Sequence, residues 1–196
     1  MTRPCSPAEA VDRAVALLGR TEPYVLGTGD YRGIGRDPFT SRGGKLGCDC
    51  WGLIAHAYRL PRHRPGYNKG RWATVSDDMN CDSAIEQAEH ATSDPVWAIA
   101  DGPPRIGDVL VWPSIRGPDR KRLRIGHVTL VVDVPAEWAP DRWDWLTVVQ
   151  CQSSRQPAIM RGPGSAWRGR ETWRGATDTR WRSRLLRARE TEPAGP

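Results

Sequence analysis

Apolar residues near the start of the chain recur at the spacing of one helix face. From Val11 to Leu18 they fall at offsets of 0, 3, 4 and 7, which is typical of an amphipathic helix. Ser6 is a common capping residue, a proline follows it at the first helical position, and Glu9 completes a capping box. A glycine stands directly after the apolar stripe, where helices often end. The pattern predicts a helix over 7–18.

The second half of the chain contains short apolar runs of the kind that form strands. Residues 109–112, 127–132 and 146–151 are rich in valine, leucine and other β-type residues. The loops between them, 113–124 and 134–145, carry glycine, proline and charged residues. Strands joined by such loops favour antiparallel neighbours over β-α-β units. We therefore expect an antiparallel meander.

Helical signals come before these strands. A second helix is expected to begin near Cys50 and to end by Leu60, because Pro61 disfavours a helical residue before it. A weaker pattern predicts a third helix over about 83–90, whereas 19–47 is typical of an irregular loop. Helices followed by strands predict an α+β fold.

The length and composition of the chain fit a single globular domain, which we place at residues 1–189. The 196 residues carry 29 cations against 23 acids, a net charge of +6, and only three of the cations are lysines. The segment 155–189 holds ten arginines and three tryptophans, so we expect part of it to pack as late strands. Residues 190–196 are expected to form a flexible tail. The positive charge favours an anionic partner or surface.

The cysteines and the N-terminal segment indicate where the chain is made. Five cysteines, an odd number, argue against a disulfide framework and for synthesis in a reducing cell. Asp12 and Arg13 interrupt the apolar residues that a secretory signal would need. No stretch approaches the roughly 20 apolar residues of a membrane span. We therefore expect synthesis in the cytoplasm without a signal peptide, and no membrane span.

The segment GCDCWGLIAHAYRL at 47–60 places a cysteine at a helix start. If Asp49 caps this helix, Cys50 lies in its first turn, where the positive end of the helix dipole stabilises a thiolate and lowers the thiol pKa. Leu53 shares the helical face of Cys50, so we expect the thiol to point toward the sheet on which the helix packs. His56 falls on another face of the helix.

One histidine is placed to act as a base. His127 opens the apolar run GHVTLVV, whose following residues would anchor it while its ring reaches a neighbouring helix start. Cys50 and His127 are therefore the plausible nucleophile and base. A third polar group should orient the imidazole, and the last expected strand offers Gln150 or, failing that, Gln152.

Two simpler interpretations stay open for these residues. A buried cysteine is commonly a small hydrophobe, and a histidine at a strand edge is often structural. In a zinc site, Cys48 and Cys50 would form a C-x-C pair, with Cys81, Cys151 and the histidines as further ligands. Structural zinc sites usually have two paired knuckles, and this sequence has one tight pair, so we expect no metal and no cofactor.

Three segments resemble, in the same order, the signature blocks of the NlpC-type cell-wall cysteine peptidases and the related CHAP amidases. They are DCWGL at 49–53, IGDVLVW at 106–112 and GHVTLVV at 126–132. The first helix and PYVLGTG at 23–29 resemble the leading helix and the turn that follows it in that family. The resemblance covers about residues 7–155.

This resemblance implies a papain-like fold, in which the helix that carries the nucleophile packs on a small antiparallel sheet. It implies Cys50 as nucleophile and His127 as base. The third position, where the family often has a histidine, is Gln150 here. Compared with minimal members of the family, residues 61–103 resemble an insertion that shapes the substrate groove.

Three further residues of the matching blocks are implied to bind or position substrate: Tyr24, Asp49 and Trp51. Tyr24 matches a tyrosine near the nucleophile of the family. Trp51 stands where the family usually has a serine, a form similar to phage tail-associated members.

The implied activity is hydrolysis of an amide bond in the stem peptide of bacterial peptidoglycan, by a phage lysin or a virion-borne enzyme that acts on the cell wall. Its implied partners are peptidoglycan and phage tail proteins. A non-enzymatic tail component that keeps the fold is the alternative, because Gln150 brings no charge to stabilise an imidazolium. An arginine-rich nucleic-acid binder is the third hypothesis. The arginines of 155–189 form no recognisable binding module, so no nucleic acid is expected as a partner.

Overall fold

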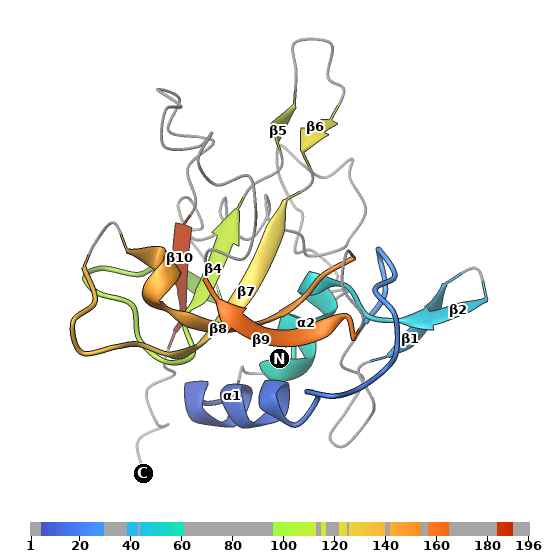
Figure 1. Cartoon of the computed structure of the whole chain (residues 1–196), viewed down its shortest axis with the longest axis horizontal. Coiled ribbons are helices and arrows are strands. Elements are labelled where there is room, and N and C mark those ends of the chain that lie inside the picture. Colours follow the sequence, from blue (N-terminus) through green and yellow to red (C-terminus); the bar gives the residue numbers. More distant parts are fainter. Residues whose placement is uncertain are drawn as a thin grey trace.

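The computed structural model describes residues 5–29, 39–42, 44–60, 96–112, 115–116, 122–124, 126–139, 142–153, 157–164 and 184–189. The predicted helix over 83–90, the possible zinc ligand Cys81 and the predicted tail 190–196 lie outside these residues. Two N-terminal helices pack on a six-stranded antiparallel sheet (Figure 1), so the predicted α+β class is confirmed.

Helix α1, Pro7–Val15, begins as predicted. The Ser6 hydroxyl accepts a hydrogen bond from the Glu9 backbone N–H, and the Glu9 carboxylate accepts one from the Ser6 N–H, which completes the capping box. The helix ends before the predicted residue 18, because the N–H groups of Leu17 and Leu18 bond to carbonyls three residues back. The chain then turns away at a glycine with positive φ.

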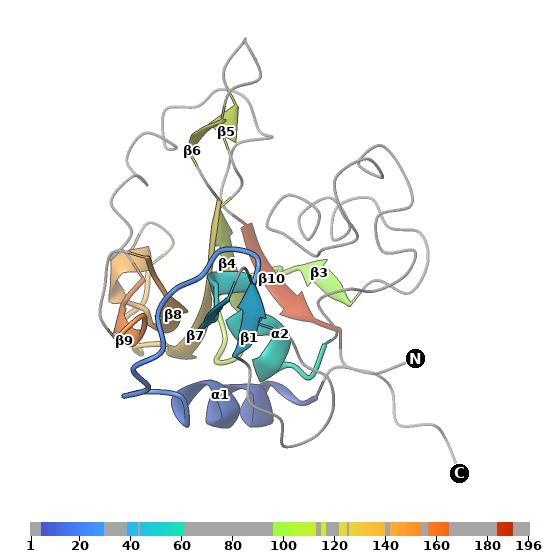
Figure 2. The same ribbon diagram turned by 90° about the vertical axis from the view of Figure 1, so that its right-hand side faces the viewer.

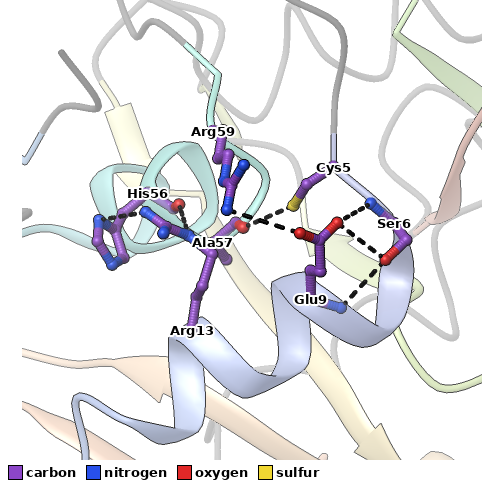
Figure 3. A network of polar contacts seen from close by, with 7 residues as sticks. All are labelled: Cys5, Ser6, Glu9, Arg13, His56, Ala57 and Arg59. Atoms are coloured by element: carbon purple, nitrogen blue, oxygen red, sulfur yellow. Dashed lines mark hydrogen bonds and ion pairs between the residues drawn. The ribbon is translucent and has the colours of Figure 1, made fainter. Parts of the chain in front are cut away.

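Helix α2, Cys50–Ala57, is anchored at its C-terminal end by residues of the α1 segment (Figure 3). The Arg13 guanidinium donates from Nε to the His56 carbonyl at 3.1 Å and lies 3.4 Å from His56 Nδ1. The Cys5 thiol donates to the Ala57 carbonyl at 3.1 Å. These donors satisfy carbonyls that the helix leaves unpaired, and the Arg13 charge suits the negative end of its dipole. The orientation of α2 is therefore set from α1.

The main sheet has the strand order β3-β10-β4-β7-β8-β9, and every neighbouring pair is antiparallel. In that order the strands are Trp97–Ile99, Arg184–Ala188, Val109–Trp112, His127–Asp133, Thr147–Cys151 and Ile159–Pro163. The run β4-β7-β8-β9 follows the chain, which confirms the predicted meander. The C-terminal strand β10 enters between β3 and β4 and breaks the sequential order.

Several smaller elements complete the fold. The hairpin of β1, Thr40–Arg42, and β2, Lys45–Gly47, leads into α2. A second hairpin, of β5, Ile115–Arg116, and β6, Arg122–Arg124, projects from the end of the sheet where β4 ends and β7 begins (Figures 1 and 2). The 3-10 helix η1, Trp143–Trp145, precedes β8.

The late segment contributes strands as expected, because β9 and β10 both lie within 155–189. Strand β3 lies within 61–103, the segment expected to be an insertion, so the end of that segment belongs to the main sheet. The β1–β2 hairpin lies within 19–47, which the sequence pattern assigned to an irregular loop.

The sheet buries both faces. The face toward the helices (Figure 2) carries Val109, Val111, Val128, Leu130, Val149, Cys151 and Leu186. The opposite face carries a second apolar cluster of Leu110, Trp112, Val131, Val148 and Leu185, together with Leu146 before β8. Within the described part of the chain, none of the helices has the length and apolar character needed to cross a membrane.

Candidate active site

Asp49 is the N-cap of α2, as the sequence predicts. Its Oδ1 accepts a hydrogen bond from the Gly52 N–H at 2.7 Å, and its Oδ2 accepts one from the Gly27 N–H, also at 2.7 Å. The Asp49 backbone N–H donates to the Thr28 carbonyl at 3.1 Å. One carboxylate therefore caps the helix and ties it to the turn after Tyr24.

Two glycines allow this turn to lie directly on the first turn of α2. A Cβ on Gly52 would lie 2.4 Å from the Thr28 carbonyl oxygen, and one on Gly29 would lie 2.7 Å from both the Cys48 Sγ and the Gly52 Cα. Gly29 also has a φ of +91°, which residues with a side chain rarely adopt. Gly29 and Gly52 are thus required because the backbones of the turn and of the helix lie so close together.

Cys50 is the first residue of α2, and its side chain is 6% exposed. The amide dipoles at this end of the helix favour a negative charge on the sulfur. The half-buried Tyr24 hydroxyl forms a hydrogen bond with Cys50. Burial raises the pKa of Tyr24, and the neighbouring Cys50 and Asp49 raise it further, so the phenol stays protonated and can donate to the Cys50 sulfur. The structure thus brings Tyr24 and Cys50 together.

Two other cysteines connect the start of α2 to the end of strand β8. The Cys48 thiol donates to the Asp49 carbonyl at 3.3 Å, and the Cys151 thiol donates to the Cys48 carbonyl at 3.2 Å. Cys151 is the last residue of β8. Because β8 runs antiparallel to β7, this end of β8 lies beside the start of β7. The start of α2 therefore lies at the same end of the sheet as His127.

His127 is the first residue of β7, and its ring is almost completely buried. Its Nε2 lies 3.0 Å from the Oε1 of Gln150 on the neighbouring strand. The same oxygen accepts a hydrogen bond from the Gln152 side-chain amide at 2.9 Å. The structure thus selects Gln150 over Gln152 as the residue that contacts the imidazole.

The orientation of the Gln150 amide decides which nitrogen of the His127 ring can act as a base. With the Gln150 oxygen toward the ring, which can only accept, the matching tautomer of neutral His127 carries its hydrogen on Nε2 and its lone pair on Nδ1. The ring is held on one side by Trp112, its cross-strand partner on β4, with ring centroids 5.8 Å apart and planes at 24°. The imidazole is therefore held between Trp112 and Gln150.

The alternation of side chains places His127 relative to the helices. Val128 and Leu130 belong to the core on the helix face, whereas His127 has the opposite parity and stacks on Trp112 in the second cluster. By this alternation the imidazole lies on the face of the sheet opposite to the one that the helices cover.

Other residues singled out by the sequence have structural positions. Trp51 is 3% exposed and lies against Trp97 of β3, with ring centroids 6.3 Å apart. The buried Asp49 carboxylate is engaged in capping. Their contact with substrate stays a prediction from the family resemblance. His56 lies at the far end of α2 beside Arg13, as its helical position predicts.

Sequence reasoning missed how Cys48 and Cys151 join the helix to the sheet. No local signal marks either residue, because the contact depends on strand pairing across 103 positions. It also treated Gln150 and Gln152 as alternatives, although their spacing of two residues on a strand indicates side chains on one face. Recognising that shared face would have suggested that both belong to the site.

The possible metal site receives no support from the arrangement of these residues. Within the described ranges, no group of three or more histidine, cysteine, aspartate or glutamate side chains is placed to hold a metal ion. The four described cysteines are free thiols. Comparison of the chain with protein-family models, with curated proteins and with solved structures finds no match.

Proposed function

We propose that this protein is a cysteine hydrolase in which Cys50 is the nucleophile and His127 the general base. The observation that carries the proposal is that two groups suited to catalysis lie at the same end of the sheet. One is a thiol at a capped helix start with a phenol donating to it. The other is an imidazole whose Nε2 is occupied by Gln150, which leaves Nδ1 as the base.

In this proposal, Nδ1 of His127 takes the proton of the Cys50 thiol, and the thiolate attacks the carbonyl carbon of an amide substrate. The negative charge on the carbonyl oxygen is stabilised at the start of α2, beside the Cys50 backbone N–H. The imidazolium then returns its proton to the departing amine, and a thioester remains on Cys50. Water, deprotonated by His127, releases the acid product and restores the thiol.

The neutral Gln150 can fill the third position of this cycle. Gln150 accepts a hydrogen bond from Nε2 in both the neutral ring and the imidazolium, so it orients the base throughout the reaction. The positive end of α2 and the Tyr24 hydroxyl stabilise the thiolate from its own side. Formation of the thiolate therefore needs a less strongly basic imidazole than deprotonation of a serine hydroxyl would need.

The proposed substrate is an amide in the stem peptide of bacterial peptidoglycan. The three sequence blocks that resemble the NlpC-type cell-wall peptidases support this substrate, and they supply Cys50 and His127. A phage lysin or tail-associated enzyme is the form that we favour, made in the cytoplasm and acting on the cell wall. Its partners would then be peptidoglycan and phage tail proteins.

Mass spectrometry of muropeptides tests both the activity and the bond that is cut. The purified protein should cleave purified peptidoglycan so that each hydrolysed bond leaves a new carboxyl group on one side and a new amine on the other. Cys50→Ala should abolish this cleavage, whereas Cys5→Ala, at the junction of α1 and α2, should retain it. Cleavage by Cys50→Ala at the original rate contradicts the proposal.

Thiol labelling separates the hydrolase from a non-enzymatic protein with the same fold. Cys5 is an internal reference, because burial and the nearby Glu9 carboxylate raise the pKa of its thiol. An activated Cys50 should react with iodoacetamide at pH 7 at least tenfold faster than Cys5. Equal or slower labelling of Cys50, together with unchanged peptidoglycan, favours a structural tail component.

A further inference from the structure

Gln150 alone does not determine how its amide faces the imidazole. The oxygen and nitrogen of a glutamine amide have nearly the same size, and a half-turn about the last side-chain bond exchanges them. With the oxygen toward His127, Nε2 carries the hydrogen and Nδ1 the lone pair. With the nitrogen toward His127, Nε2 must accept, and the hydrogen moves to Nδ1. The second arrangement removes the base that the proposed hydrolase needs.

We propose that Gln152 is a positioning residue that holds the Gln150 amide with its oxygen toward His127, an inference whose catalytic meaning rests on the function proposed above. The Gln152 amide nitrogen lies 2.9 Å from Gln150 Oε1, the same oxygen that lies 3.0 Å from His127 Nε2. Two donors thus converge on one acceptor. With Gln152 in its observed orientation, turning the Gln150 amide would place an NH2 group against the Gln152 donor.

The surroundings of the Gln150–Gln152 contact favour one orientation of the Gln150 amide. Gln150 and Gln152 are both buried, so bulk water does not replace a lost partner. Gln152 follows the last residue of β8, and its backbone N–H donates to the Ala158 carbonyl at 2.9 Å, which holds the backbone at this position. Trp112 restricts the His127 ring from its other neighbouring strand. The tautomer of His127 is therefore set from a residue that does not touch the ring.

The direct test is the tautomer of His127, measured by nitrogen NMR of the imidazole at a pH above its protonation. The wild-type protein should carry the hydrogen on Nε2. Gln152→Glu replaces the donor by an acceptor, so the Gln150 amide should turn, donate to the new carboxylate and to Nε2, and move the hydrogen to Nδ1. Ser153→Ala, at the exposed neighbouring residue, should leave the wild-type tautomer unchanged.

The carboxylate introduced by Gln152→Glu would be buried and could prevent folding, so two further variants complete the test. Gln152→Met removes the donor without adding charge, and the Nδ1–H form should then rise to at least a tenth of the population. In the background of Gln150→Glu, whose carboxylate has two equivalent oxygens, Gln152→Met should no longer change the tautomer. The inference is overturned if both Gln152 variants keep the wild-type tautomer, or if the effect persists in the Gln150→Glu background.

Kinetics separate this inference from the proposed function. In an active enzyme, Gln152→Glu should lower kcat about a hundredfold or more with little change in KM, because the base is lost while substrate contacts remain. If wild-type protein hydrolyses no peptidoglycan but Gln152→Glu still exchanges the tautomer, the proposed function fails and the positioning role of Gln152 stands. If the enzyme is active and Gln152→Glu keeps both the wild-type tautomer and full kcat, the inference fails and the function stands.

Discussion

Asp108 and Arg187, which are 79 positions apart in the chain, form a bidentate ion pair. The guanidinium donates from Nε to Oδ1 at 2.8 Å and from Nη2 to Oδ2 at 2.7 Å. Oδ2 also accepts from the Arg105 backbone N–H at 2.7 Å, and the carboxylate is 2% exposed. The aspartate of the IGDVLVW block therefore attaches β10 to the beginning of β4.

Arg187→Met should destabilise the fold by about 2–3 kcal/mol, because it leaves the Asp108 carboxylate buried without its charged partner. Chemical denaturation monitored by tryptophan fluorescence measures this loss. Arg161→Met, at an exposed position of β9, is the matched control and should cost less than about 0.5 kcal/mol. Equal stability of the two variants would show that the ion pair contributes nothing beyond an exposed arginine.

Gly52→Ala should cost about 2 kcal/mol or more and disturb the candidate active site. The new Cβ would lie 2.4 Å from the Thr28 carbonyl oxygen, so the turn at residues 27–29 must move away from α2. Gly162→Ala is the control, because its Cβ would have only the end of the Met160 side chain at 3.8 Å. Denaturation midpoints and the Cys50 labelling rate should both change in the first variant alone. A Gly52→Ala protein that keeps both wild-type values contradicts the close approach.

Tyr24→Phe should raise the pH midpoint of Cys50 alkylation by about one unit. The phenol donates to the Cys50 sulfur, and a hydrogen bond to a charged group contributes roughly 1.5–3 kcal/mol, whereas one pKa unit corresponds to about 1.4 kcal/mol. Losing the donor disfavours the thiolate, so the thiol pKa rises and labelling at pH 7 slows. Iodoacetamide rates between pH 5 and 9 measure the shift, with Cys5 as the reference. An unchanged midpoint would show that Tyr24 does not stabilise the Cys50 thiolate.

Glu9→Gln should weaken the capping of α1 in a pH-dependent way. Hydrogen bonds from the Ser6 backbone N–H and hydroxyl, followed by the charges of Arg59 and Arg13, lower the Glu9 pKa in the folded protein. A lowered folded pKa stabilises the fold above the unfolded value of about 4.3, and this contribution is lost as the pH falls through the folded value.

Thermal unfolding of wild type and Glu9→Gln between pH 7 and 3 tests this linkage. The gap between their midpoints should be constant at neutral pH and should close below about pH 4.5. Glu137→Gln, at an exposed position outside the capping box, should show no such closing gap. A gap that widens toward low pH would reverse the sign and contradict the assignment.

The elements with strong local signals could be predicted from the sequence. The predicted strand at 109–112 has the same bounds as β4, and the helix expected to begin near Cys50 begins there as α2. Asp49 caps the helix as expected, because a short acidic side chain before an apolar run satisfies the first free N–H groups. These features depend on neighbouring residues, so the sequence pattern contains them.

The features that depend on distant pairing could not be predicted. Nothing local indicates that β10 enters between β3 and β4, because that position depends on the Asp108–Arg187 pair and on strand register. The burial of Trp51 likewise depends on Trp97, from a segment expected to be an insertion. The contact between His127 and Gln150 is present in the structure, and both residues lie in apolar runs that the sequence assigns to strands; their roles as base and orienting residue stay a prediction.

The position of β10 also has a consequence for the order of folding. Among the described strands, β3 pairs only with β10, although β3 precedes the whole β4-β7-β8-β9 meander in the chain. A nascent polypeptide therefore presents β3, with Trp97, long before its partner exists, and non-local pairing of this kind is slow. An unpaired apolar edge can recruit other chains. Newly made protein should thus pass through an aggregation-prone stage that ends only when β10 docks.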